Sequence, residues 1–193
     1  LVAGEELKLK AAKNGELMAA DGKQINRLRS EIGFVFQNFN LWPHMSILDN
    51  IIEAPRRVLG QSKAEAIEVA EALLAKVGIS DKRHAYPAQL SGGQQQRAAI
   101  ARTLAMQPKV ILFDEPTSAL DPEMVQEVLN VIRALAEEGR TMLLVTHEMG
   151  FARQVSSEVV FLHQGLVEEQ GSPQQVFDNP LSARCKQFMS SNR

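Results

Sequence analysis

The sequence predicts an α/β fold built around a parallel sheet, and three observations support this prediction. The apolar string at residues 110–113 has the composition of a strand buried on both faces, which is typical of parallel sheets. A second buried strand is predicted at residues 141–145, after a stretch with helical periodicity. The first string ends at Asp114 and Glu115, at the carboxyl end of its strand, where α/β sheets bind ligands.

The chain ahead of this strand predicts a helix whose first residues face an anion. Ser91 is a good N-cap, and Gly92 and Gly93 let the backbone come close to whatever lies ahead of the helix. Apolar residues then recur at helical spacing until a proline, Pro108, ends the run: Ala98, Ala101, Leu104 and Ala105. Free N–H groups and the helix dipole favour an anion at such a start, typically a phosphate. Together with the two carboxylates, this helix start indicates nucleotide chemistry.

Three consecutive motifs in this stretch resemble those of one family. Residues 90–94, Leu-Ser-Gly-Gly-Gln, resemble the signature motif of ABC-transporter ATPases, residues 110–115 resemble their Walker B strand, and residues 114–121 run on into a segment that resembles their D-loop. Their order and spacing favour this family over a buried strand that happens to end in two acids. The resemblance implies a P-loop NTPase-like ABC ATPase core with a helical subdomain, of which residues 1–193 would form a partial, N-terminally truncated domain.

The composition allows one domain with a real core and limits the classes of function. The chain has 193 residues and a net charge of −2, which argues against a protein that binds nucleic acid through its bulk charge. A lone cysteine, Cys185, rules out an internal disulfide and suits a reducing compartment. No apolar run approaches the roughly 20 residues of a membrane helix, and no secretory signal is visible. We therefore expect a soluble, cytosolic chain.

The first segment, residues 1–44, is predicted to be rich in β-structure. Asn14-Gly15 is a strong hairpin signal between residues 5–12 and 16–20, and Asp21 could cap a short helix. Residues 32–36 read as a strand that ends at Gln37. A glutamine there could be a solvated loop residue, but the sequence of residues 38–44 resembles the segment after the Q-loop glutamine of the family.

Residues 45–90 have a helical pattern and lie where the family places its helical subdomain. Ser62 and Glu65 form a capping box, and the helix that they begin should end at Gly78. In the family this subdomain docks a short coupling helix of the membrane subunit. The candidates for the docking groove are Phe39, Leu41, Trp42 and Met45, although core packing is at least as common for any one of them.

Residues 91–193 carry the signature helix and the elements after it. Asp121-Pro122 predicts a helix start and Gly139 its end, after which comes the strand at residues 141–145 with His147 beyond it. A lone histidine is more often a satisfied polar residue than a catalyst, but its place after such a strand resembles the H-loop of the family. A hairpin is predicted at residues 158–162 and 166–170, then a short helix from Ser172-Pro173 and a terminal helix at residues 181–189.

A P-loop, Gly-x-x-x-x-Gly-Lys-Ser/Thr, is absent from the sequence. Gly22-Lys23 is the nearest match, but Gln24 comes next and no glycine lies five residues before Gly22. In the family the P-loop lies upstream of the point where this chain begins. We therefore expect a fragment or an incomplete gene product of an ATPase, with exposed sheet edges, weak ATP binding and near-background hydrolysis on its own.

The resemblance implies a role for each motif in two ATPase domains that close face to face around two ATP molecules. Ser91, Gly92, Gly93 and Gln94 would act in trans on the γ-phosphate bound by the other subunit. Mg²⁺ would be held by Asp114, largely through water, and reached by Gln37.

The remaining candidates would handle the attacking water and the coupling between sites. Glu115 would orient and polarise the water, and His147 would bridge it to the γ-phosphate. Asp121 would couple the two sites across the dimer. This chemistry is phosphoryl transfer by positioning and electrostatics, without a covalent intermediate.

Three strings, at residues 39–45, 90–97 and 145–152, resemble bacterial importers of polar amino acids, and the insertion at residues 10–29 resembles the subgroup for basic ones. The implied partners are a second ATPase subunit, two transmembrane permease subunits and, indirectly, a periplasmic binding protein, with no nucleic acid. The implied location is peripheral, on the cytoplasmic face of the inner membrane.

Two alternatives stay open at this stage. One is an ABC ATPase that moves no solute, such as a DNA-repair, chromosome or translation factor, although no coiled coil, zinc insertion or tandem domain is visible. The other is a non-hydrolytic subunit that acts by docking. Intact Glu115 and His147 argue against this second alternative, while the absent P-loop argues for it.

Overall fold

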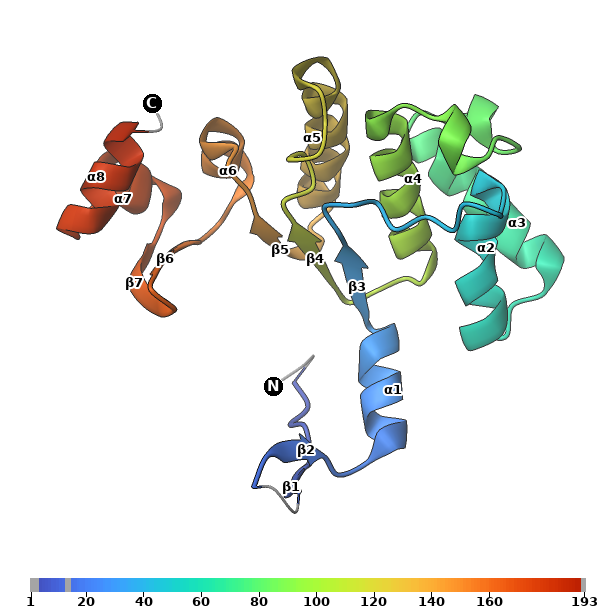
Figure 1. Ribbon diagram of the computed structural model, residues 1–193, viewed down its shortest axis with the longest axis horizontal. Coiled ribbons are helices and arrows are strands. Elements are labelled where there is room, and N and C mark those ends of the chain that lie inside the picture. The colour runs from blue at the N-terminus through green and yellow to red at the C-terminus, as the bar shows by residue number, and fades with distance from the viewer. Residues whose placement is uncertain (1–3, 13–14, 192–193) are drawn as a thin grey trace. The chain divides into compact units, whose positions relative to one another are not determined.

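A computed structural model describes residues 4–12 and 15–191, in two compact units. The first unit ends at Val145, and the second begins at Thr146. The element order is mixed α/β, and Figure 1 labels each helix and strand. None of the helices within the described ranges combines the length and apolarity that a bilayer span requires.

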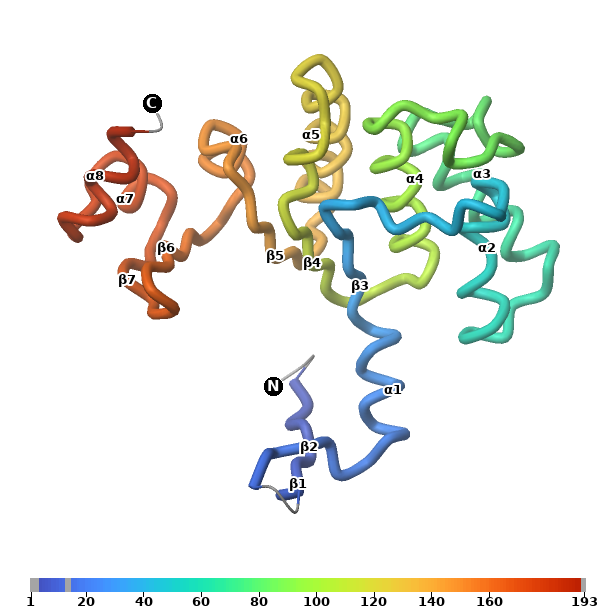
Figure 2. The backbone as a smooth tube through the Cα atoms, in the orientation of Figure 1, coloured from blue at the N-terminus to red at the C-terminus, as the bar shows by residue number. Residues whose placement is uncertain are grey.

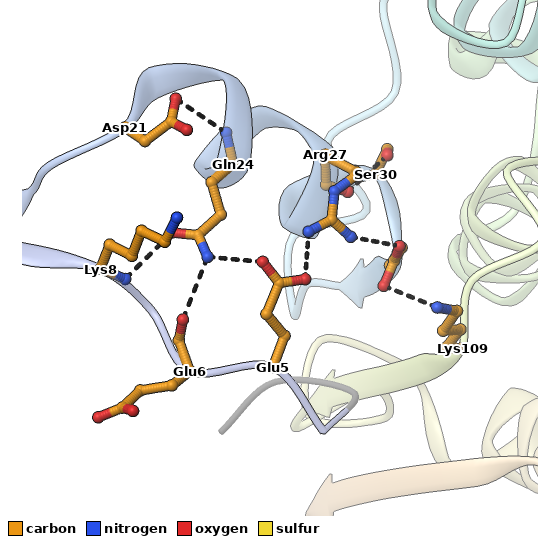
Figure 3. Close-up of polar contacts among 9 residues, drawn as sticks. Glu5, Glu6, Lys8, Asp21, Gln24, Arg27, Ser30 and Lys109 are labelled. Carbon is orange, nitrogen blue, oxygen red and sulfur yellow. Dashed lines mark hydrogen bonds and ion pairs between the residues drawn. The ribbon is translucent and has the colours of Figure 1, made fainter.

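The N-terminal segment forms the predicted hairpin and helix. Strands β1 (Leu9–Ala11) and β2 (Leu17–Ala19) pair antiparallel, while Asn14 of the predicted turn lies outside the described residues. Helix α1 (Gly22–Ser30) is capped by Asp21, whose Oδ1 accepts from the Lys23 N–H at 2.8 Å. The buried Gln24 side chain accepts from the Lys8 N–H at 3.0 Å and donates to Glu5 Oε1 at 2.6 Å (Figure 3), so α1 is tied to the chain that precedes β1.

A three-stranded parallel sheet forms the centre of the first unit. Its strands are β3 (Ile32–Val35), β4 (Val110–Asp114) and β5 (Thr141–Val145), in the order β3-β4-β5. Val35 pairs with Phe113, and Asp114 pairs with Val145, so the carboxyl ends of all three strands lie at one edge. The predicted parallel sheet is confirmed.

The predictions that β4 is buried on both faces and that β5 is a buried strand are wrong. Ile111 and Phe113 are each only 1% exposed, but the alternate residues Val110 and Leu112 are half-buried. In β5, Leu143 is 59% exposed and Val145 52% exposed. Side chains alternate across a sheet, and here only one of the two faces is closed to solvent.

Helix α4 (Gly92–Ala105) packs against the closed face of the sheet. Gly33 of β3 faces this helix so closely that a Cβ atom would lie 2.5 Å from Thr103 Cγ2. The Thr103 hydroxyl is within hydrogen-bond distance of the Phe34 carbonyl, at 3.3 Å, and of the Ala99 carbonyl, at 2.9 Å. The strand and the helix are therefore joined by both packing and hydrogen bonds.

Four helices of the first unit pack on one another beside the sheet (Figure 1). They are α2 (Ile47–Val58), α3 (Lys63–Lys76), α4 (Gly92–Ala105) and α5 (Pro122–Glu137), with short 3₁₀ turns at Ser80–Lys82 and Pro87–Gln89. The predicted Ser62–Glu65 capping box is present, and Gly78 just past the end of α3 has a φ of +71°. The helix contacts bury an apolar core that includes Ile51, Ile52, Leu74, Ile100, Ile132 and Leu135.

The second unit contains the predicted hairpin and three helices, two of which lie close to the predicted positions. Strands β6 (Val159–His163) and β7 (Leu166–Gly171) pair antiparallel, and α7 (Pro173–Asp178) starts after Ser172. Helix α8 (Ala183–Ser191) begins two residues later than predicted. Helix α6 (Met149–Val155) was not predicted from the sequence. It has seven residues and only one buried side chain, Phe151, so it gives no periodic signal.

Candidate functional site

The start of α4 is built as the sequence predicts. The Ser91 hydroxyl accepts from the Gln94 N–H at 3.3 Å, and Gln94 Oε1 accepts from the Ser91 N–H at 3.1 Å. This capping box uses two backbone donors and leaves the hydroxyl hydrogen of Ser91 available to donate. The half-buried Ser91, Gly92 and Gln94 and the buried Gly93 therefore form a helix tip suited to an anion.

Both glycines of this tip are in close contact with the segment after β4. A Cβ atom on Gly92 would lie 3.1 Å from Leu120 Cδ2, and one on Gly93 would lie 3.0 Å from Met124 Cβ. The Gly93 N–H donates to Met124 Sδ at 3.5 Å. The helix tip and the segment at the start of α5 are thus packed so closely that a larger residue at either position would require its neighbour to shift.

Asp114 and Glu115 lie at the carboxyl edge of the sheet. Asp114 is exposed at the end of β4, and Glu115 is half-buried with a φ of +44°. The Glu115 N–H donates to the Val145 carbonyl at 2.9 Å, while its carbonyl accepts from the Ser118 N–H at 3.2 Å. A non-glycine residue in the left-handed region is uncommon, and these bonds on both sides hold it there.

Gln37 lies exposed at the same edge, two residues beyond β3. It belongs to the 36–46 loop, which we define as residues 36–46 between β3 and α2. Figure 2 shows this loop running from the end of β3 past α4 to α2. Because β3 and β4 are adjacent and parallel, Gln37 and the two carboxylates come after neighbouring strands.

Three side chains that the sequence reasoning missed hold the 36–46 loop in place. Gln96 Nε2 donates to the Phe36 carbonyl at 3.2 Å, and the Arg102 guanidinium donates to the Phe39 and Asn40 carbonyls at 3.0 and 2.6 Å. The buried Asn50 accepts from the Trp42 N–H at 2.8 Å and donates to the Trp42 and Met45 carbonyls. No local spacing marks Gln96 and Arg102, because their partners in the loop lie 60 or more residues away, whereas those of Asn50 lie within eight residues.

The four candidates for a docking groove all lie in this loop. Trp42 is 39% exposed, and Phe39, Leu41 and Met45 are not core residues either. None of the four is a fully buried core residue, but Phe39, Leu41 and Met45 are half-buried, so packing within the chain remains a role for these three. The role of the four in docking stays a prediction.

Asp121 and His147 are the remaining predicted site residues. Asp121 occupies the N-cap position of α5, as predicted, and its exposed carboxylate accepts no capping hydrogen bond from the helix. In the first unit, Gln37, Asp114 and Glu115 lie at the ends of neighbouring strands or just beyond them, and the Ser91–Gln94 helix tip packs against the segment after β4. His147 lies in the second unit, two residues past β5.

The oxygen donors at this edge suit a hard divalent cation such as Mg²⁺. Such an ion keeps several waters and takes one or two carboxylates together with substrate phosphates. Asp114 is exposed at the end of its strand, so its oxygens can be donated to a metal. Over the residues described, no cluster of three or more His, Cys, Asp or Glu forms a ready-made metal cage.

Comparisons with known proteins agree with this geometry. The family model described as ABC transporter matches residues 5–118. The chain is 63% identical over its whole length to 76% of the arginine/ornithine transport ATP-binding protein of Pseudomonas aeruginosa. It is 56% identical over its whole length to 75% of the histidine/lysine/arginine/ornithine transport ATP-binding protein of Escherichia coli.

Solved structures of similar sequence have the same fold. One is the ATP-binding cassette MJ0796, a dimer in a post-hydrolysis state bound to ADP and Pi, which is 33% identical with a TM-score of 0.67 over 85% of this chain and 75% of that one. Another is cbiO1 from Clostridium perfringens, part of the ABC transporter complex cbiONQ, 29% identical with a TM-score of 0.74 over 86% of this chain and 69% of that one. The chain therefore belongs to the ABC transporter family and is an ATPase of the ATP-binding-subunit type.

Proposed function

We propose that this chain is the ATP-binding and hydrolysing part of an importer for polar, basic amino acids. The observation that carries the proposal is the packing of the Ser91–Gln94 helix tip against the segment after β4, at the same end of the unit as Asp114 and Glu115. The relatives named above, which transport arginine, ornithine, histidine and lysine, support the substrate class. Their names also count against an ABC ATPase that moves no solute.

The helix tip is proposed to serve a phosphate bound by a second subunit. The Ser91 hydroxyl and the Gly92 N–H at the start of α4 would donate to the γ-phosphate, and the helix dipole would favour its charge. Gly92 and Gly93 suit this packing because a Cβ atom there would lie only 3.1 Å from Leu120 and 3.0 Å from Met124, so a larger residue would require the neighbour to shift. Asp121, whose carboxylate is not used by its own helix, is proposed to contact the second subunit.

The carboxyl edge of the sheet is proposed to hold the metal and position the water. Asp114 and Gln37 would hold Mg²⁺, which would neutralise charge on the phosphates. Glu115 would orient and polarise the attacking water, with the direction in which its side chain leaves the backbone set by its φ of +44°. His147 would contact that water and the γ-phosphate.

We propose the assembly and location on the same grounds. Two ATPase subunits would bind two permease subunits, with a periplasmic amino-acid-binding protein acting indirectly. The exposed Trp42 and its neighbours in the 36–46 loop would meet the permease, and residues 45–90 would form the helical subdomain. The subunit would lie peripherally on the cytoplasmic face of the inner membrane.

A chimera tests the proposed import. The matched 76% of the Pseudomonas aeruginosa relative is replaced by this chain, and the chimera is expressed in a strain that lacks the relative. Uptake of labelled arginine should return to within about tenfold of the rate with the relative, because the chain would supply the signature, Walker B and D-loop motifs. A chimera that assembles with the permease and hydrolyses ATP but moves no basic amino acid would contradict the proposal.

A further inference from the structure

The 36–46 loop has an unusual backbone just after Gln37. Phe39 and Asn40 have φ values of +49° and +52°, so two consecutive non-glycine residues are in the left-handed region. Such residues persist only where the surroundings hold them, and they concentrate at functional sites. The contacts that hold these two residues therefore decide how the chain after Gln37 is arranged.

Arg102, in the last turn of α4, makes those contacts. Its Nη1 and Nη2 atoms donate to the Asn40 carbonyl at 2.6 Å and the Phe39 carbonyl at 3.0 Å. Its guanidinium carbon lies 5.4 Å from the centre of the Trp42 ring, at cation–π distance. The planar fork of an arginine can bond two adjacent carbonyls at once, whereas a lysine offers only a single ammonium.

The contacts of Arg102 are directed to the loop rather than to an acidic partner. No described carboxylate forms an ion pair with it, and burial lowers the pKa of the guanidinium. Removing a cation partly from water is unfavourable unless its donors are satisfied, and backbone carbonyls of the loop satisfy them here.

The two ends of α4 are thereby connected to the same loop. At the start of the helix, a Cβ on Gly92 would lie 3.6 Å from Phe39 Cζ, so the Phe39 ring packs beside the signature motif. In the middle, the fully buried Gln96 donates to the Phe36 carbonyl. Near the end, Arg102 holds the Phe39 and Asn40 carbonyls.

We propose that Arg102 is a positioning residue that fixes the chain after Gln37 to the signature helix, so that a shift of the loop moves Ser91–Gln94 with it. The consequence for hydrolysis rests on the roles proposed above for Gln37 and the signature motif. The contacts between Arg102 and the loop need no nucleotide. Their test can therefore fail while the proposed function stands, and the proposed function can fail while Arg102 still holds the loop.

The test uses the full chain and its one tryptophan, Trp42, as a local probe. Arg102→Met keeps the length of the side chain but removes the fork and the charge, and Arg102→Lys keeps the charge without the fork. Arg29→Met, at an exposed arginine of α1, is the matched control. Hydrogen exchange of the backbone amides, acrylamide quenching of Trp42 and thermal melting are measured for each variant.

In Arg102→Met we expect exchange in residues 37–42 to speed up by about tenfold or more, and Trp42 to become more accessible to acrylamide, because the loop loses two hydrogen bonds. Arg102→Lys should show a smaller change at the same residues, and Arg29→Met none. Amides of α2, α3 and the buried part of α4 should keep their protection. If Arg102→Met does not fold, the proposal is decided by Arg102→Lys alone, in which faster exchange should be confined to the loop.

Two results would overturn the assignment. Exchange and quenching equal to those of the parent chain in both Arg102 variants would mean that the loop is held without the fork. Faster exchange spread evenly over α2, α3 and α4 would mean that Arg102 only stabilises the unit as a whole.

Discussion

At the scale of single residues, Glu115 combines a strained backbone with a position at the end of a strand. Its φ of +44° is kept by hydrogen bonds to Val145 on one side and Ser118 on the other. The Ser118 hydroxyl lies 2.9 Å from the Glu115 carbonyl and adds a third contact. This backbone fixes the direction in which the side chain leaves the sheet, as preorganised catalysis requires.

Glu115→Gln tests whether this carboxylate acts on water. In the chimera, the replacement keeps the shape of the side chain and removes its capacity to accept a proton, so ATP turnover should fall by about 10² or more while ATP binding persists. Glu137→Gln, at an exposed glutamate near the end of α5, is the control and should leave turnover unchanged. Phosphate release and nucleotide retention measure the two effects. Unimpaired turnover of Glu115→Gln would exclude the proposed role.

The buried Cys185 should make the free energy of unfolding depend on pH in the alkaline range. The thiol is fully buried, and burial, with a contribution from the Glu169 charge, raises its pKa from 9.0 to about 11. Below pH 9 it is protonated in both the folded and the unfolded chain, so its contribution to stability is complete there. As the pH rises from 9 to 11 the unfolded chain loses the proton first, and the free energy of unfolding falls by up to about 2 kcal/mol.

Denaturant unfolding at about pH 8, 9.5 and 11 checks this expectation. The difference in unfolding free energy between the parent chain and Cys185→Ala should shrink as the pH rises, because only the parent chain carries the thiol. A difference that stays constant over this range would show that the thiol has the same pKa in both states.

At the scale of elements, the joint between β3 and α4 depends on the absence of a side chain at Gly33. A methyl group there would lie 2.5 Å from Thr103 Cγ2 and 3.0 Å from Pro108 Cγ. The Thr103 side chain cannot easily turn away, because its hydroxyl contacts the carbonyls of Phe34 and Ala99.

Gly33→Ala should therefore lower the free energy of unfolding by about 1–3 kcal/mol, the range for overpacking a core. Gly22→Ala is the control, since no atom lies within 4 Å of the position of its added methyl group. Urea unfolding of the two variants measures the difference. Equal stability of both would mean that β3 and α4 separate at little cost.

The elements that could be predicted from the sequence are those with local signals. Ser62 and Ser91 each begin a helix with a glutamate or glutamine three residues later, and both capping boxes form. The exposed face of β5 could not be predicted, because an apolar strand has the same sequence whether or not another layer covers it. The role of Arg102 could not be predicted either, since it acts on carbonyls more than 60 residues away, which no spacing encodes.

At the scale of the whole molecule, each reaction centre would be the product of two chains. The signature helix of one subunit would meet the phosphates held by the other, whose P-loop supplies the phosphate-binding backbone. The printed sequence contains no Gly-x-x-x-x-Gly-Lys-Ser/Thr string, and in the proposed arrangement this chain would contribute the signature half of a site. An intact relative whose own signature is disabled offers the other half.

Phosphate release from a mixture of the two chains tests this central claim most directly. The Pseudomonas aeruginosa relative, with the serine of its signature motif replaced, should hydrolyse ATP at near-background rates alone, and this chain should raise the rate at least about tenfold. Ser91→Ala should abolish the gain, whereas Ser62→Ala, which removes the same kind of helix cap at α3 for about 1 kcal/mol, should keep it. A stable complex of the two chains without any gain, or an equal gain with Ser91→Ala, would contradict the claim.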